Sequence, residues 1–457
     1  MNRITKRNVF ALVLVLALIA GVVLFCVRYV TSAGDWVAFS GSPHVYSGSN
    51  LNTGLVLDRR GTVLLDSTEG RYYAYDSSVR QSTMHLLGDR YGYIPSPLLD
   101  EYADDLIGYN LITGIYNASD ETGNLNLSID ATAQVTALQL LAGRAGTVGV
   151  YNYKTGEILC SVTSPTYDPD NMPDVEADTT GQYDGVYVNR LFNAKYTPGS
   201  IFKLVTAAAA IENIPDIDQQ TFTCEGSYIV GGQTITCDGV HGQIGFQDAL
   251  AKSCNCAFGQ IAQQLGTKTM MEYAKKLGIT ESLSFDGITT AAGNFDVSGA
   301  TEGDLAWAGI GQYTDQINAC QYMMLMGQIA AGGKAATPYL ASSVTLGDHT
   351  VYRASTHEAD CGLDRATTER LADMMRYNVE NIYGAWQFPN VRVCAKSGTA
   401  EVGGDTASTA TFAGFIQDEA YPLAFIVIVE EGGYGSTTCA PIAGAVLQAC
   451  MNAMDAG

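Results

Sequence analysis

The sequence has few basic residues for its length. Its 457 residues include 25 Lys and Arg against 47 Asp and Glu, and only five His, so the formal net charge is −22. Nucleic acids and anionic lipid surfaces attract basic proteins, so this balance argues against a nucleic-acid partner and against electrostatic binding to a membrane surface. The acidity is typical of a solvated outer surface.

Cysteine pairs with metal-binding spacing are also missing. The chain has eleven Cys but no CxxC pair and no Cys/His cluster with zinc spacing, and Cys254 and Cys256 are too close together for the usual zinc loop. We therefore predict no metal site, and we predict no cofactor. Outside the cytoplasm disulfides are permitted, and Cys224 and Cys237 flank a Gly-rich turn at residues 229–233, which makes them the best candidates for a pair across a hairpin. Most other cysteines are expected to be small buried residues.

One apolar run is long enough to cross a membrane. Residues 9–27 (VFALVLVLALIAGVVLFCV) contain no charged side chain, and three basic residues precede them. A run of this length spans a bilayer, and the preceding basic residues place the N-terminus in the cytoplasm and the rest of the chain outside. Two alternatives are a cleaved signal peptide with a weak exit site at residues 31–33, and lipid modification of Cys26.

The rest of the chain is too long for one ordinary domain. The first residues, 1–8, form the predicted cytoplasmic tail, and residues 28–50, rich in Ser, Gly and Asn, predict a linker. Short β-like runs over 51–142 predict a small non-catalytic module, which we call the pedestal. Residues 143–457 form the larger domain.

The larger domain begins and ends with strand-like runs. Residues 147–151 and 157–162 flank a turn and predict a hairpin, and a long helical region is expected over about 200–335. The later runs are 391–396, 410–416 and 423–429 for strands and 443–454 for a closing helix. Because 423–429 is continuously apolar, it fits a strand that is covered on both faces. We predict one sheet assembled from distant halves of the chain.

The first chemically suggestive motif is the segment from Ser200 to Lys203. Pro198 and Gly199 precede it, and an Ala-rich apolar run follows, so Ser200 is expected at the N-terminus of a buried helix, where negative charge is favoured. Lys203 lies one turn later on the same face. Poor solvation lowers the pKa of such a lysine, and its neutral amine can then take the Ser200 proton. Alone, so short a motif more often marks an N-capping serine with a surface lysine.

The second motif is Ser253-Cys254-Asn255. A hydroxyl and an amide two residues apart can face one cleft from a turn beside a helix. The hydroxyl of Ser253 can relay a proton to a leaving group, and the amide of Asn255 can orient an acyl substrate. Alone, this motif carries little information.

The third motif, from Lys396 to Thr399, is predicted at the end of a strand. Lys396 offers a positive charge for a carboxylate, and the hydroxyls of Ser397 and Thr399 can hold one. Gly398 is expected to remove a side chain that would block an extended substrate. A strand N–H can complete an oxyanion hole. Alone, the segment fits a polar strand end.

Together, the three motifs have the order S-x-x-K, S-x-N and K-[ST]-G, which is typical of penicillin-binding proteins and class A β-lactamases. Further segments resemble class B penicillin-binding proteins over nearly the whole chain; they are 57–64 (LDRRGTVL), 127–130 (LSID), 154–159 (KTGEIL), 164–169 (SPTYDP), 309–312 (GIGQ) and 337–338 (TP). The resemblance implies an α+β, multidomain protein with the penicillin-binding transpeptidase fold. Such a protein has an antiparallel sheet of about five strands flanked by helices, an all-helical subdomain, a small β-rich N-terminal pedestal and one transmembrane helix.

The resemblance also implies a peptidoglycan D,D-transpeptidase. Ser200 would attack the D-Ala-D-Ala bond of a stem peptide, and the amine of a second stem would resolve the acyl-enzyme. β-Lactams would acylate the same serine. The remaining roles would fall to Lys203 as base, Ser253 as proton relay, Asn255 as substrate-amide contact, Lys396, Ser397 and Thr399 as carboxylate site, and the backbone N–H groups of Ser200 and Thr399 as oxyanion hole.

The same resemblance places the chain in a bacterial cytoplasmic membrane, with its catalytic domain outside, and makes a polytopic glycosyltransferase a plausible partner in cell-shape or division work. Three alternatives stay open. A β-lactam hydrolase would need a carboxylate-bearing E-x-x-L-N segment, which is missing between Ser253 and Lys396. A β-lactam sensor or scaffold would be expected to carry further membrane spans. A D,D-carboxypeptidase would differ only in using water as the acceptor.

Overall fold

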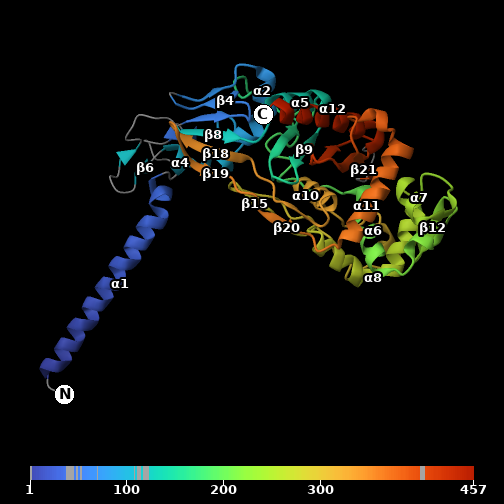
Figure 1. The fold of residues 1–457 in the computed structure, drawn as a ribbon, viewed down its shortest axis with the longest axis horizontal. Helices are drawn as coiled ribbons and strands as arrows, with labels where there is room; N and C mark the ends of the chain where they lie inside the picture. Colours follow the sequence, from blue (N-terminus) through green and yellow to red (C-terminus); the bar gives the residue numbers. More distant parts are fainter. Residues whose placement is uncertain are drawn as a thin grey trace.

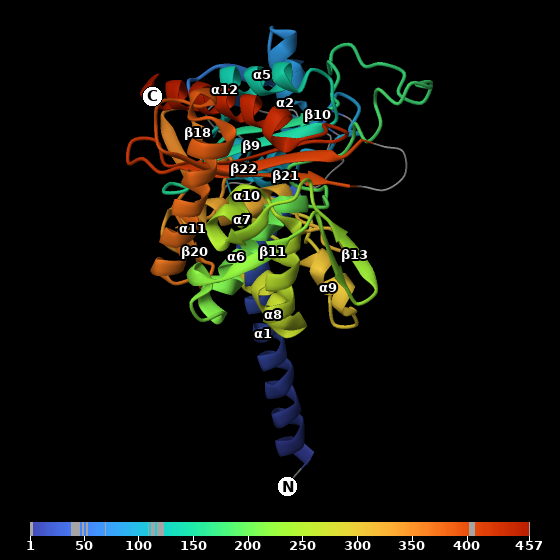
Figure 2. The same cartoon turned by 90° about the vertical axis from the view of Figure 1, so that its right-hand side faces the viewer.

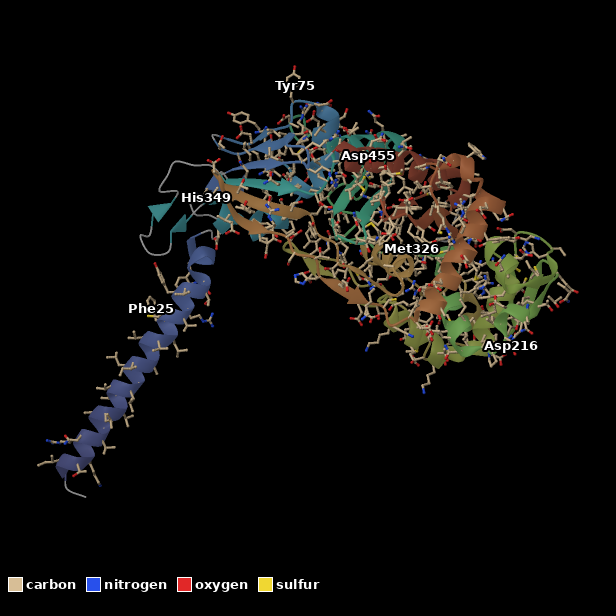
Figure 3. All side chains as sticks on the ribbon, in the orientation of Figure 1. Phe25, Tyr75, Asp216, Met326, His349 and Asp455 are labelled. Atoms are coloured by element: carbon tan, nitrogen blue, oxygen red, sulfur yellow. The ribbon has the colours of Figure 1, made fainter. Side chains whose placement is uncertain are left out.

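The computed structural model describes residues 3–37, 46–47, 50–51, 54–68, 70–107, 109–110, 115–116, 123–401 and 407–456. Its first helix, α1 (Arg3–Val37), stands away from the folded body (Figure 1), and side chains such as Phe25 point outward from it (Figure 3). Residues Ile4–Ser32 of this helix are long and apolar enough to cross a membrane, and none of their most apolar window is buried. The predicted span 9–27 lies within α1.

The predicted linker 28–50 is wrong over its first part. Helix α1 continues to Val37, so residues 28–37 are helical rather than extended. No proline interrupts this stretch, and its only Gly, Gly34, lies close to the helix end, so nothing in the local sequence ends the helix after the apolar run. Residues 38–45 of the same prediction lie outside the described residues.

A five-stranded antiparallel sheet forms the centre of the larger domain. Its strand order is β10-β9-β23-β22-β21, so a hairpin from the start of the domain pairs with strands from its end. The strands are β9 (Gly146–Asn152), β10 (Ile158–Ser164), β21 (Val393–Ala400), β22 (Thr409–Ile416) and β23 (Leu423–Val429). The predicted hairpin and the predicted joining of distant halves are both confirmed.

Helices cover both faces of this sheet (Figure 2). Helices α5 (Ala131–Leu141) and α12 (Gly435–Ala456) pack on one face, and α10 (Ala319–Ala330) packs on the other. Strand β23 shows the result: Phe425 and Val427 belong to the core under α12, whereas Ile426 and Ile428 belong to the opposite core. Each such side chain stabilises the fold by about 1.5–3 kcal/mol when fully buried. The continuous apolar run is therefore explained by cover on both faces.

The helical part of the domain lies beyond α10 and carries strands of its own. Two two-stranded sheets interrupt it, β11 paired with β14 and β12 paired with β13. The prediction of an all-helical subdomain missed these pairs, although residues 229–233 were expected to form a turn. The elements are α6 (Lys203–Asn213), β11 (Thr221–Cys224), β12 (Ser227–Val230), β13 (Gln233–Thr236), β14 (Gly242–Gly245), α7 (Phe246–Ala251), α8 (Asn255–Lys276), α9 (Glu302–Ala308) and α11 (Arg365–Asn378).

A second sheet, of six strands, lies in the pedestal and includes strands from distant parts of the sequence. Its order is β19-β18-β8-β3-β4-β5, and two of its strands come from beyond residue 340. These strands are β3 (Leu55–Leu57), β4 (Val63–Asp66), β5 (Tyr72–Tyr73), β8 (Gly123–Leu127), β18 (Ala341–Leu346) and β19 (His349–Arg353). Strand β18 pairs with β8 from Ala341 opposite Leu127 to Leu346 opposite Gly123. The predicted domain boundary near residue 143 stays a prediction. The pedestal sheet also includes β18 and β19, which come from far beyond that residue.

The remaining elements are short. The helices among them are α2 (Ser77–Leu87), α3 (Pro97–Glu101) and α4 (Ala103–Ile107), with one-turn helices at Gly199–Phe202, Ile217–Gln219, Val379–Tyr383 and Ala385–Gln387. The strands are β1 (Tyr46–Ser47), β2 (Asn50–Leu51), β6 (Tyr109–Asn110), β7 (Ile115–Tyr116), β15 (Ser284–Phe285), β16 (Ile288–Thr289), β17 (Lys334–Ala336) and β20 (Glu358–Asp360).

Candidate active site

Ser200 lies in a tight turn that leads directly into α6. The turn Gly199–Phe202 is a 3-10 helix, and the backbone of Gly199 has a φ of +57°. A Cβ on Gly199 would lie 2.4 Å from the carbonyl oxygen of Thr399 on β21. Glycine therefore supplies both the left-handed backbone and the close approach between this turn and the strand. The predicted first and third motifs meet at this contact.

Lys203 is fully buried and connects the first motif with the second. Its Nζ lies 2.7 Å from Ser200 Oγ, 2.8 Å from the Ser253 carbonyl oxygen and 2.7 Å from Asn255 Oδ1. Burial is the largest influence on its pKa and lowers it to about 8, although nearby Cys237 and Cys254 act in the opposite direction. A neutral amine has two N–H donors and one lone pair. In the charged form Lys203 Nζ donates to Ser200 Oγ, whereas in the neutral form the two acceptors can take both N–H groups, which would leave the lone pair for the Ser200 hydroxyl.

The second motif forms the turn before α8. Ser253 has a φ of +54°, a conformation that costs a residue other than glycine about 1–3 kcal/mol. Its Oγ lies 3.2 Å from Lys203 Nζ and 3.0 Å from Lys396 Nζ, so the hydroxyl bridges the two lysines. The amide of Asn255 accepts from Lys203 and donates to the carbonyl oxygen of Thr236 over 2.8 Å. Asn255 is thus held by protein groups on both sides.

Lys396 is placed differently from the prediction. It lies inside β21 rather than at the strand end, because residues 398–400 go on pairing with 409–411. Its side chain is fully buried, and Nζ donates to the Ser397 carbonyl oxygen over 2.7 Å as well as to Ser253 Oγ. Burial, and after it the charge of Lys203, holds the pKa of Lys396 well below its ordinary value. Lys396 therefore lies behind the cleft, and its Nζ contacts the cleft residue Ser253.

The expectation that Gly398 leaves room for an extended substrate is also corrected. A Cβ at this position would lie 2.2 Å from Thr411 Oγ1 and 2.9 Å from the Pro198 carbonyl oxygen. The missing side chain therefore makes room for the Ser200 turn and for β22, not for an extended substrate. Gly398 therefore allows the Ser200 turn to pack closely against β21.

A cleft of about 400 Å³ opens over these residues. Its walls include six of the predicted site residues, namely Ser200, Ser253, Asn255, Ser397, Gly398 and Thr399. The sequence reasoning gave no role to Trp307, Gln312, Tyr383 and Tyr434, which also line it. Gln312 donates to the Thr399 carbonyl oxygen over 3.2 Å, and the family-like segment GIGQ was the available signal for it. No comparable motif marked Tyr383.

Tyr383 orients the edge strand β21. Its hydroxyl accepts the backbone N–H of Ser397 over 3.0 Å and lies 3.1 Å from Ser397 Oγ. We expect Tyr383→Phe to weaken the non-covalent binding of a β-lactam about tenfold, because the Ser397 hydroxyl loses its orientation while Ser200 and Lys203 are untouched. Stopped-flow labelling separates the binding constant from the acylation rate constant. A loss confined to the acylation rate constant would contradict this role.

The matched control for that variant is Tyr377→Phe. Tyr377 lies on α11 and its hydroxyl bonds Asp248 at 3.0 Å, away from the cleft walls. We expect the control to leave both labelling constants unchanged.

The cysteines depart from the prediction. All eleven, which lie within the described residues, have free thiols, so Cys224 and Cys237 are not joined. Instead, the Sγ atoms of Cys224, Cys237 and Cys254 and a ring nitrogen of His241 lie within 4.8 Å of one another beside the cleft. The sequence reasoning missed this group, because its members come from four separate positions that no short spacing rule contains. The predicted absence of a metal site stays a prediction.

Comparisons with known proteins agree with this geometry. The family model described as the penicillin-binding protein transpeptidase domain matches residues 146–448. The chain belongs to this family. The peptidoglycan D,D-transpeptidase PbpA of Mycolicibacterium smegmatis is 26% identical over 380 residues, which cover 76% of each chain. PbpA of Mycobacterium tuberculosis is 24% identical and covers 78% of each chain.

Solved structures share the fold of this penicillin-binding protein. The ceftriaxone acyl-enzyme complex of penicillin-binding protein A from M. tuberculosis aligns with a TM-score of 0.75 at 24% identity, over 87% of this chain and 98% of that one. The D,D-transpeptidase domain of an Eggerthella lenta peptidoglycan glycosyltransferase aligns with the same score over 88% and 98%. The predicted class B penicillin-binding family, its fold and its serine-type D,D-transpeptidase class are confirmed.

Proposed function

We propose that Ser200 is the nucleophile of the D,D-transpeptidase reaction in this chain and that Lys203 is its base. One observation carries the proposal: the buried amine of Lys203 lies 2.7 Å from Ser200 Oγ, and its remaining contacts at that distance or slightly longer are to acceptors. A buried amine with two acceptors as neighbours, and with the Ser200 hydroxyl nearer to it than the Ser253 hydroxyl, is arranged to take the proton of Ser200.

In the first step, Ser200 Oγ attacks the carbonyl carbon of the penultimate D-alanine of a stem peptide. The hydroxyl proton passes to Lys203, and the oxyanion is stabilised by the backbone N–H groups of Ser200 and Thr399. Collapse of the tetrahedral intermediate breaks the carbon–nitrogen bond and forms the acyl-enzyme. The proton reaches the departing amine of the terminal D-alanine through Ser253, whose hydroxyl lies 3.2 Å from Lys203 Nζ.

Substrate binding falls to the opposite wall of the cleft. The hydroxyls of Ser397 and Thr399, on the edge strand β21, hold the terminal carboxylate in this proposal, and Asn255 contacts the acyl amide. Lys396 supports the carboxylate site from behind and keeps the Ser253 hydroxyl in place over 3.0 Å. In the second step, the amine of a neighbouring stem peptide attacks the acyl carbon, the bond from this carbon to Ser200 Oγ breaks, and a proton of the amine returns to Ser200 Oγ. The new amide cross-links the two stems.

The chain works at a membrane surface in this proposal. The apolar helix α1 anchors it in the bacterial cytoplasmic membrane, with the N-terminus inside and the cleft outside. The substrate is then lipid-linked or nascent peptidoglycan, which fits a partnership with a polytopic glycosyltransferase. The acidic balance of the chain fits an exposed outer domain.

The products of the reaction test the proposal. We expect full-length protein in detergent, supplied with nascent peptidoglycan carrying pentapeptide stems, to release D-alanine and to form cross-linked stem dimers in equal amounts, measured by mass spectrometry. Prior treatment with penicillin should stop both. D-alanine release without dimers would identify a carboxypeptidase, and rapid loss of the penicilloyl adduct would identify a β-lactam hydrolase.

A further inference from the structure

Three thiols and one imidazole converge beside the catalytic cleft. Cys224 Sγ lies 3.4 Å from His241 Nδ1, and Cys237 Sγ lies 3.6 Å from the same nitrogen and 3.9 Å from Cys254 Sγ. The sulfur–sulfur separation of 3.9 Å exceeds the roughly 2.05 Å of a disulfide bond by a wide margin. The four atoms form one compact group.

Three of the six separations among these atoms match a tetrahedral zinc site, and all six are at most 4.8 Å. With Zn–S bonds of about 2.3 Å and a Zn–N bond of about 2.05 Å, two sulfurs on a tetrahedron lie about 3.8 Å apart, and a sulfur and a nitrogen about 3.5 Å. The three observed separations fall within roughly 0.1 Å of these values. Thiolate and imidazole ligands in a tetrahedron select zinc over magnesium, calcium and manganese.

We propose that Cys224, Cys237, His241 and Cys254 bind one structural zinc ion. The three cysteines lose their thiol protons to solvent when the ion binds, and the neutral imidazole bonds through Nδ1. Four protein ligands close the coordination sphere, so no position is left for water or substrate. The bound group carries a net charge of −1.

The ligands lie where a bound ion would stabilise the local fold. Cys224 ends β11, Cys237 follows β13, and His241 precedes β14, so the ligands tie together the ends of two separate two-stranded sheets. Few side chains of these strands are buried. An isolated two-stranded sheet is marginally stable in water, and a structural metal replaces the missing core.

The surroundings also favour thiolate ligands. Cys254 is the N-cap residue of α8, and the backbone N–H of Ala257 donates to its Sγ over 3.4 Å. The positive end of a helix stabilises a thiolate.

The site adjoins the catalytic turn directly. Cys254 is the middle residue of the Ser253–Asn255 motif, and both of its neighbours contact Lys203. Ser253 has the strained left-handed backbone, which a metal bond to the next residue would hold in place. The zinc would thus fix the second motif against the first.

Metal analysis tests the proposal. We expect full-length protein, purified from cells grown with zinc and without chelators, to contain one zinc ion per chain by inductively coupled plasma mass spectrometry. Cys224→Ser and His241→Ala should each reduce this content at least about fivefold, because each removes one bond of a closed site. Cobalt-substituted wild type should show the visible bands of a tetrahedral thiolate complex.

Two further thiols provide controls. Cys361→Ser removes a buried thiol far from the cluster, and Cys256→Ser removes the sulfur next to it that does not belong to the four. Both should keep the zinc. Zinc lost in Cys256→Ser, a Cys224–Cys237 disulfide in the wild type, iron or copper in place of zinc, or no bound metal would each overturn the proposal.

A chelator strong enough to remove the ion should lower the melting temperature by at least about 5 °C and slow penicillin labelling. Readdition of zinc should restore both. The effect on labelling rests on the proposed function, whereas the metal content does not. Zinc-bound protein that fails to label would therefore count against the catalytic assignment alone, and metal-free protein that labels normally would count against the zinc site alone.

Discussion

Ser200→Ala is expected to abolish covalent labelling by a fluorescent penicillin. The hydroxyl of Ser200 lies 2.7 Å from Lys203 Nζ, closer than the Ser253 hydroxyl at 3.2 Å, and this contact activates the nucleophile in this proposal. Release of D-alanine from stem peptides should fall at least about 10⁴-fold, the order of loss found when a serine nucleophile is removed. Gel fluorescence and product analysis by mass spectrometry measure the two effects.

The fold should survive this change. Within the described residues, the side chain of Ser200 forms a hydrogen bond with Lys203 alone, so the melting temperature should stay within about 2 °C of wild type. Ser284→Ala removes an exposed hydroxyl on β15 and is the matched control, which should label normally. Persistent labelling of the Ser200 variant would show that another residue carries the acyl group.

Lys203→Met is expected to slow acylation by about 10²–10⁴-fold, the range of a general base. Methionine keeps an unbranched side chain in the buried position but has no lone pair that can take the Ser200 proton. The carbonyl oxygen of Ser253 and Asn255 Oδ1 also lose a donor, so some loss of stability accompanies the loss of rate. Stopped-flow labelling and thermal unfolding measure the two effects.

The pH dependence identifies the base. Burial lowers the pKa of Lys203 to about 8, so the neutral form that accepts a proton prevails above that pH and is lost below it. In wild type, the acylation rate should rise as pH increases towards 8 and level off above it. The residual rate of Lys203→Met should lack this rise, whereas Lys268→Met, which changes an exposed lysine on α8, should keep it. A wild-type rise that persists in the Lys203 variant would point to another base.

The catalytic residues could be predicted from the sequence because the residues of each motif lie close together along the chain. The spacing from Ser200 to Lys203 is one helical turn, and the apolar run 423–429 fits a strand that is covered on both faces. Only the family resemblance indicated that the three motifs form one site, because no local pattern predicts that the Ser200 turn contacts Thr399. The burial of Lys396 behind Ser253 needed the fold.

The parts that the sequence did not predict depend on contacts between distant positions. The cluster of Cys224, Cys237, His241 and Cys254 is formed by strand ends and a helix N-terminus that come together only after folding. Gly398 faces Thr411 and Pro198, a direction that its own motif does not specify. The hydroxyl of Tyr383 reaches Ser397 from a short helical turn without any recognisable motif.

The return of β18 and β19 to the pedestal has a mechanical consequence. Strand β18 is hydrogen-bonded to β8 in the pedestal, and the chain joins β18 to segments beneath the catalytic sheet. A force on the pedestal would therefore be transmitted to the larger domain through β18. Ser128, at the end of β8, adds a link by donating to the carbonyl oxygen of Ile158 on β10. The pedestal and the larger domain are thus joined by a shared sheet and by this hydrogen bond, so a displacement of the pedestal would be expected to move the catalytic sheet with it.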